Sequence, residues 1–267
     1  MTAHPSHDDR HNVEPVPADT IASDVIHNAP DPDLYLDESG GEGQTFVRSE
    51  NRPVRILAIG GTTSAKSWSL TPLEAALQRA QAGGCETVLA TVYDLNLPLF
   101  RTDWKLEDYP PTLAWLLDEV RKADGLIICS PTYHGTISGA VKNGLDALIF
   151  LGWDKPPYLG GKPVGVMAFG GMTAMGVLHA LTTTVRGMKG ITIPTHVAVP
   201  ERAVDRDTAR IVDPRINERI DLMVEELVSF SARLRVPHTA PRVRRPTATV
   251  TIAGKGASST EGSKPAP

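Results

Sequence analysis

Between residues 54 and 235, short apolar runs alternate with longer segments in which apolar residues recur at about every third or fourth position. Short apolar runs rich in β-branched residues are typical of buried strands, and the longer spacing is typical of helices with one packed side. The sequence predicts strands at about 54–60, 86–93, 125–130, 162–169 and 191–199, and helices at about 67–82, 110–123, 138–149, 174–187 and 213–235.

This alternation of strands and helices predicts an α/β fold. Strands that are apolar throughout need cover on both faces, which helical crossovers between parallel strands supply. Five strands fit a doubly wound parallel sheet in the order 2-1-3-4-5, with helices on both faces. In that order a ligand crevice opens between strands 1 and 3, at their carboxyl ends.

Composition divides the chain into three parts. Residues 1–50 carry 11 acidic and 2 basic residues, and residues 237–267 are rich in Pro, Ser and Gly with a net charge of +4. Neither segment has the apolar content to form a core, so we expect a disordered acidic N-terminal arm, a domain at 51–236 and a disordered basic tail. Since the arm contributes −9 to a total of −4, the domain is near +1. A domain so nearly neutral, with no basic stripe, argues against nucleic-acid binding.

The cysteines and the apolar runs bear on where the protein works. Two cysteines, Cys85 and Cys129, cannot form a disulfide framework, and Cys129 lies within an apolar strand where a small core residue is expected. No apolar run reaches 18 residues, and the first 30 residues lack the pattern of a secretory leader. We therefore expect a soluble cytoplasmic protein with no membrane partner.

A polar loop follows the first predicted strand. Residues 60–69 read Gly-Gly-Thr-Thr-Ser-Ala-Lys-Ser-Trp-Ser, with glycines for close backbone approach, several hydroxyls and a helix start whose N–H groups can bind an anion. A Walker A loop is one residue away, but Ala65 replaces its second glycine and no strand ends in the Asp that would hold Mg²⁺. A structural alternative is that Ser64 or Ser67 only caps the helix. No Gly-x-Gly-x-x-Gly fingerprint for a dinucleotide follows this strand.

Two more loops follow strands at the same predicted edge. The run Ser130-Pro-Thr-Tyr-His-Gly-Thr136, followed by Ser-Gly-Ala-Val-Lys-Asn-Gly-Leu-Asp, comes after the third strand, and Phe169-Gly-Gly-Met-Thr-Ala-Met-Gly176 comes after the fourth. Together with the 60–69 loop, these runs resemble the NADPH-dependent FMN reductase family of flavodoxin-like enzymes. The family has Gly-Ser-x-Arg-x-x-Ser-x-Asn in its phosphate loop, and this chain has Ser64 at the position of the arginine.

The resemblance covers about residues 54–200 and implies an oxidoreductase that takes hydride from NADPH or NADH onto bound FMN and passes it to an acceptor such as free flavin, a quinone or an azo compound. It implies FMN-binding roles for Gly61, Thr62, Ser64, Ser67, Ser69, Pro131, Thr132, Tyr133, His134, Gly135, Thr136, Gly170 and Gly171. Hydride moves directly between stacked rings, so no catalytic side chain and no metal ligand are named. The resemblance also implies a homodimer or homotetramer, and a flavin-dependent monooxygenase is a candidate partner.

Several alternatives stay open at the level of sequence. A non-catalytic flavin-binding electron carrier would be strongly acidic around its flavin, unlike this domain, and a flavin sensor is a further alternative. His134 could contact flavin or stand exposed to solvent, and metal binding has little support because no Cys or His cluster accompanies it. Tyr133 is likewise divided between ring contact and packing.

Overall fold

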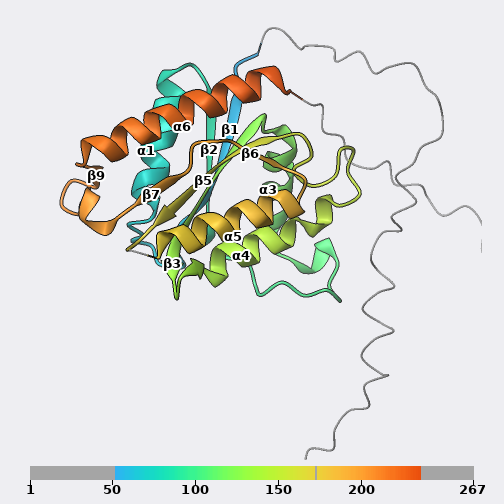
Figure 1. Ribbon diagram of the computed structural model, residues 1–267. Coiled ribbons are helices and arrows are strands. Elements are labelled where there is room, and N and C mark those ends of the chain that lie inside the picture. The colour runs from blue at the N-terminus through green and yellow to red at the C-terminus, as the bar shows by residue number, and fades with distance from the viewer. Residues whose placement is uncertain (1–51, 172, 236–267) are drawn as a thin grey trace, which may run out of the picture. The chain divides into compact units, whose positions relative to one another are not determined.

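The computed structural model describes residues 52–171 and 173–235. The arm at 1–50 and the tail at 237–267, which the sequence predicts to be disordered, lie outside the described residues. Figure 1 shows a central sheet with helices on both sides. No helix among the described residues combines the length and the apolarity that a membrane crossing needs.

The central sheet is parallel along its main path, in the order β2-β1-β3-β5-β6. Its strands are β1 (Arg55–Gly60), β2 (Glu86–Thr91), β3 (Gly125–Tyr133), β5 (Pro163–Phe169), β6 (Ile191–Thr192) and β7 (Val197–Val199). Both β6 and β7 pair with β5, so together they occupy the place of one edge strand. The predicted flavodoxin-like order 2-1-3-4-5 is therefore confirmed.

Helices cover the two faces of the sheet. On one face lie α1 (Leu70–Ala82) and α6 (Pro214–Arg233), and on the other lie α3 (Pro111–Lys122), α4 (Gly139–Asp146) and α5 (Ala174–Gly187). Side chains alternate along each strand, so neighbouring residues enter different cores. Ile56 packs with α1 and α6, for example, whereas Leu57 packs with the helices of the opposite face.

The predicted second strand is too long. It ends at Thr91, and Val92–Leu95 form the short helix α2. The Thr91 side chain caps this helix by accepting a 2.9 Å hydrogen bond from the Asp94 backbone N–H. Local capping therefore prevails over the β-branched composition of the run.

The predicted edge strand is interrupted in its middle. Pro194 has no N–H to donate to the sheet, and Thr195 is held instead by α6, where Glu226 accepts hydrogen bonds from its backbone N–H and its hydroxyl, each at 2.9 Å. The run therefore divides into β6 and β7.

The third strand is longer than predicted and pairs with β4 (Thr136–Ile137). The predicted helix at 138–149 is α-helical only to Asp146 and continues as the 3-10 turn η4 (Ala147–Leu151). Shorter elements complete the fold: η3 (Leu106–Asp108), η5 (Glu201–Ala203), β8 (Val204–Asp205) and β9 (Arg210–Ile211).

Candidate functional site

A cleft of about 370 Å³ opens at the carboxyl ends of β1, β3 and β5, along the lower edge of the sheet in Figure 1. Three loops that follow these strands and a segment after β7 form its walls. The lining residues are Thr62, Ser64, Lys66, Ser67, Trp68, Ser69, Pro131, Thr132, Tyr133, Phe169, Gly170, Gly171, Thr173, Glu201 and Arg206.

The first wall is the loop between β1 and α1. A Cβ at Gly60 would lie 2.5 Å from the Cys129 carbonyl oxygen, so only glycine allows β1 to run this close to β3. Gly61 has a φ of +95°, a conformation that glycine adopts easily and that turns the chain out of the sheet. The loop then leads into α1, which begins at Leu70.

The hydroxyl groups of Thr62, Ser67 and Ser69 make hydrogen bonds within this loop. The Thr62 hydroxyl accepts a 3.2 Å hydrogen bond from the Ser64 N–H, and the hydroxyls of Ser67 and Ser69 are 2.9 Å apart. Ser69 occupies the N-cap position of α1, but its side chain makes no cap hydrogen bond. The polar groups of the loop therefore line the cleft and are not used to cap α1.

The second wall is a β-hairpin. β3 pairs antiparallel with β4, and the two residues between them, His134 and Gly135, have φ of +50° and +82°. Two successive positive φ values define the type I′ turn that suits a two-residue hairpin. Tyr133 lines the cleft just before the turn, while His134 is exposed at its tip.

The third wall follows β5 and approaches the hairpin closely. A Cβ at Gly170 would lie 2.8 Å from both the Cβ and the Oγ1 of Thr132, and Gly170 has a φ of +146°. The Thr132 Oγ1 is buried and makes no hydrogen bond within the described residues. A buried hydroxyl without a partner carries a desolvation cost that a bound polar group can relieve.

The cleft brings together most of the sequence-predicted residues. Those that line it are Thr62, Ser64, Ser67, Ser69, Pro131, Thr132, Tyr133, Gly170 and Gly171. Four others belong to the same segments but do not line the cleft. Gly61 is buried at the start of the first loop, and His134, Gly135 and Thr136 form the hairpin turn and the beginning of β4.

Sequence reasoning assigned no role to Trp68, Glu201 or Arg206, although all three line the cleft. The Arg206 Nη2 donates a 3.0 Å hydrogen bond to the Glu201 Oε2, and the Arg206 guanidinium carbon lies 5.8 Å from the centre of the Trp68 ring. Glu201 and Arg206 come after β7, the last strand of the central sheet, where the sequence has no recognised motif. Only their charge was visible in the sequence.

Cys129 lies beneath the first loop and takes no part in the surface of the cleft. It is fully buried, and its Sγ donates to the Ser69 carbonyl oxygen at 3.6 Å. Burial raises the pKa of this thiol to about 12, so it stays protonated at neutral pH. The expectation of a core cysteine is confirmed.

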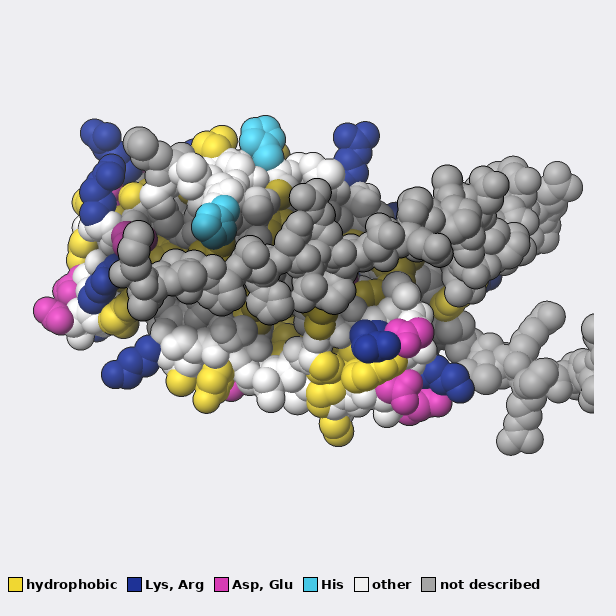
Figure 2. Space-filling view, turned by 90° about the horizontal axis from the view of Figure 1, so that it is seen from below, with side chains coloured by type: hydrophobic (Ala, Val, Ile, Leu, Met, Phe, Trp, Pro, Cys, Tyr) yellow, Lys and Arg dark blue, Asp and Glu magenta, His cyan; other side chains and the backbone are white. Residues whose placement is uncertain are grey.

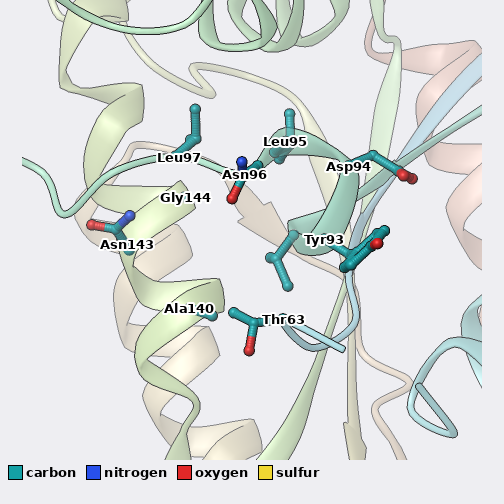
Figure 3. Close-up of a pocket in the computed structure, with 10 residues that line it drawn as sticks. Thr63, Tyr93, Asp94, Leu95, Asn96, Leu97, Ala140, Asn143 and Gly144 are labelled. Atoms are coloured by element: carbon teal, nitrogen blue, oxygen red, sulfur yellow. The ribbon is translucent and has the colours of Figure 1, made fainter. Parts of the chain in front are cut away.

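A second cavity, of about 460 Å³, lies between α2 and α4 (Figure 3). Asn143 fixes one side of it: its Oδ1 accepts from the Phe100 N–H at 2.7 Å, and its Nδ2 donates to the Pro98 carbonyl at 2.9 Å. Its lining residues include Asp94 but no lysine or arginine. This cavity offers a phosphate no cationic partner, so the cleft beside β3 and β5, which Lys66 and Arg206 line, is the better anion site.

The fold and the cleft define a flavodoxin-like flavoprotein, and comparison with known proteins gives its family. The profile of the NADPH-dependent FMN reductase family matches residues 54–203. The NADPH-dependent FMN reductase ArsH of Shigella flexneri is 31% identical over 189 residues, which are 70% of this chain and 71% of that protein. The FMN-dependent NADPH-azoreductase of Staphylococcus saprophyticus is 32% identical over 128 residues, which are 46% of this chain and 65% of that protein.

The chain is also similar to solved structures of flavin oxidoreductases. An NADH:FMN oxidoreductase, EmoB, is 25% identical with a TM-score of 0.50 over 64% of this chain and 89% of that chain. The flavoenzyme FerB of Paracoccus denitrificans shares the fold, with 18% identity and a TM-score of 0.54 over 68% of this chain and 100% of that chain. The chain belongs to the NADPH-dependent FMN reductase family and is an NAD(P)H-dependent flavin oxidoreductase that uses FMN. The predicted family and enzyme class are confirmed.

Proposed function

We propose that the cleft at the ends of β1, β3 and β5 binds FMN, and that the enzyme reduces a small oxidised acceptor with electrons from NADPH or NADH. The observation that carries the proposal is the chemistry of the walls. Hydroxyls and a helix start meet glycines in close backbone contact at the strand ends where this fold class binds ligands.

The phosphate of FMN suits the loop at 61–69. The hydroxyls of Thr62, Ser64, Ser67 and Ser69 line the cleft here, and α1 begins at Leu70. The positive end of a helix dipole favours an anion, and hydroxyls can donate to phosphate oxygens. No step of this assignment requires a metal ion.

The flavin ring suits the other two walls. Gly171, where a Cβ would meet nothing within 4 Å, leaves room for a planar group. Tyr133 offers an aromatic face, and the unpartnered Thr132 hydroxyl offers a hydrogen bond to a polar ring edge. When bound, FMN supplies a ring that accepts and releases hydride. The residues of the cleft bind and orient the rings, so we assign no catalytic side chain.

We propose the acceptor only as a chemical class. The open space beside Gly171 suits flat oxidised molecules, namely free flavin, quinones or azo compounds, and two of the relatives bear the names FMN reductase and azoreductase. Reduced free flavin would serve a flavin-dependent monooxygenase. We further propose a cytoplasmic homodimer or homotetramer.

The first test is an anaerobic visible spectrum of the full chain with equimolar FMN, before and after NADPH and then NADH. We expect a protein-perturbed flavin band that bleaches faster than free FMN does. A perturbed band that neither donor bleaches would favour an electron carrier or sensor, and an unperturbed band would contradict FMN binding.

A matched pair of variants locates the binding site. A Cβ at Gly171 or at Gly187 meets nothing within 4 Å, and neither glycine has a positive φ, so both accept a larger side chain. Only Gly171 lines the cleft. We expect Gly171→Leu to fold and lose FMN affinity, and Gly187→Leu to bind FMN like the parent protein. Equal affinity in both variants would exclude this cleft.

A further inference from the structure

We propose that Arg206, a residue outside the phosphate loop, supplies a guanidinium contact to the FMN phosphate in place of the arginine that the loop lacks at position 64. The inference rests on the proposed function, because it assumes that FMN occupies the cleft. It concerns a segment that the family profile does not reach, since the match ends at residue 203.

The phosphate loop of this chain is short of positive charge. Ser64 stands where the family pattern has arginine, and Lys66 is the only cation between residues 60 and 69. The Lys66 side chain is exposed. A flexible, well-hydrated ammonium is a weaker phosphate ligand than a guanidinium held in place, because more side-chain entropy is lost for each hydrogen bond.

A small hairpin anchors the turn that carries Arg206, and the Arg206 side chain, which is 57% exposed, is oriented by its ion pair with Glu201. The strands of the hairpin pair at Val204 with Ile211 and at Asp205 with Arg210, and the buried side chain of Val204 joins the core beneath α1 and α6. The Asp205 carboxylate closes the turn by accepting from the Asp207 N–H at 2.9 Å and from the Thr208 hydroxyl at 2.7 Å. The turn that carries Arg206 therefore has a defined position.

The hairpin places the Arg206 guanidinium over the phosphate loop. Its carbon lies 5.8 Å from the ring centre of Trp68, the residue between Ser67 and Ser69. Arg206 also lines the same cleft as those two hydroxyls. In Figure 2, which views the molecule from below, Lys and Arg side chains gather at the left end, the end where β9 lies in Figure 1.

Glu201 has two opposing effects on this site. It holds Arg206 through the 3.0 Å contact to Nη2, but its carboxylate also lines the cleft and would repel a phosphate. A guanidinium has five N–H donors, so Arg206 can keep Glu201 and still donate to a second anion. Removing the charge of Glu201 should therefore help phosphate binding, whereas a purely structural ion pair would be harmed by it.

The test compares FMN with riboflavin, which lacks the phosphate, by quenching of flavin fluorescence. For Arg206→Ala we expect FMN affinity to fall about ten-fold, the scale of one charge-assisted hydrogen bond, and riboflavin affinity to stay unchanged. Arg210→Ala is the matched control, because Arg210 lies on the other strand of the same hairpin and does not line the cleft.

Two more variants distinguish phosphate binding by Arg206 from a structural role of its ion pair with Glu201. Glu201→Gln should bind FMN at least as tightly as the parent protein does. Ser64→Arg should tighten FMN in the parent and restore the affinity lost in Arg206→Ala. If Glu201→Gln instead weakens FMN and riboflavin together, the Arg206 pair is structural and the inference fails.

The remaining outcomes are distinct. If FMN binds but Arg206→Ala matches Arg210→Ala, Arg206 does not bind the phosphate, and the proposed function still holds. If Arg206→Ala changes the preference for NADPH over NADH without changing FMN affinity, the residue serves the donor and the inference is overturned. If neither flavin binds the parent protein, the proposed function itself fails.

Discussion

Close backbone contacts at glycine residues set the shape of the cleft. Gly176, in the first turns of α5, is the tightest of these contacts: a Cβ there would lie 2.0 Å from the Gly135 carbonyl oxygen at the hairpin turn. The helix therefore supports the hairpin that carries Tyr133 only because residue 176 has no side chain. The contact partner is backbone, so a substitution must move the hairpin or the helix.

We expect Gly176→Ala to lower the free energy of unfolding by about 1–2 kcal/mol, because overpacking outweighs the gain in helix propensity of about 1 kcal/mol. FMN affinity should fall with it. Gly187→Ala, in the same helix with open space around the new Cβ, should be neutral or slightly stabilising. Urea unfolding of both variants measures the difference, and equal stabilities would contradict a rigid contact.

At the scale of elements, the end of the sheet away from the cleft is held by a buried lysine. Lys162, which precedes β5, is 3% exposed, and its Nζ donates to the carbonyls of Ala123 at 2.6 Å and Arg121 at 3.2 Å, at the end of α3. Burial lowers the pKa of Lys162 to about 8. The folded protein therefore releases this proton at a lower pH than the unfolded chain does.

This difference predicts a pH dependence of stability. Between pH 8 and 10.5 the unfolded chain binds more protons at Lys162, so the free energy of unfolding attributable to this residue rises with pH, by up to ~3 kcal/mol. Expressed as parent minus Lys162→Met, the difference in unfolding free energy should rise across this window. The raised pKa of Cys129 contributes equally to both proteins and cancels. A constant difference from pH 7 to 10 would contradict the prediction.

At the scale of the molecule, the face covered by α3 and α4 exposes large apolar side chains. Ile149 is 49% exposed, Trp153 58% and Trp115 42%. Burial of apolar surface at an interface contributes about 25 cal/mol per Å², so we infer that the proposed dimer forms through this face.

We expect Ile149→Glu to raise the dimer dissociation constant at least about ten-fold, because a carboxylate would lose its hydration in the interface. Leu222→Glu is the control: Leu222 is 47% exposed but belongs to α6, on the opposite side of the sheet. Sedimentation at several protein concentrations measures both. Dissociation by Leu222→Glu alone would assign the interface to the other face.

The sequence by itself determined the order of elements, the parallel sheet and the loops that meet at its carboxyl edge. These features depend on local periodicity and on glycine and hydroxyl motifs that are contiguous in the chain, as at 60–69 and 130–136. The same local signals misjudged the ends of elements where a cap or a missing N–H prevails, as at Thr91 and Pro194.

Only the tertiary structure decided which side chains share the cleft. It kept His134 out of the cleft lining by placing it in a hairpin turn, which depends on the pairing of Tyr133 with Thr136. It also brought Arg206 close to Trp68, 138 positions away in the chain. Such contacts arise from packing between distant segments, which no pattern of neighbouring residues encodes. That is why the sequence could indicate an FMN reductase, yet could not indicate the arginine that we propose completes its phosphate site.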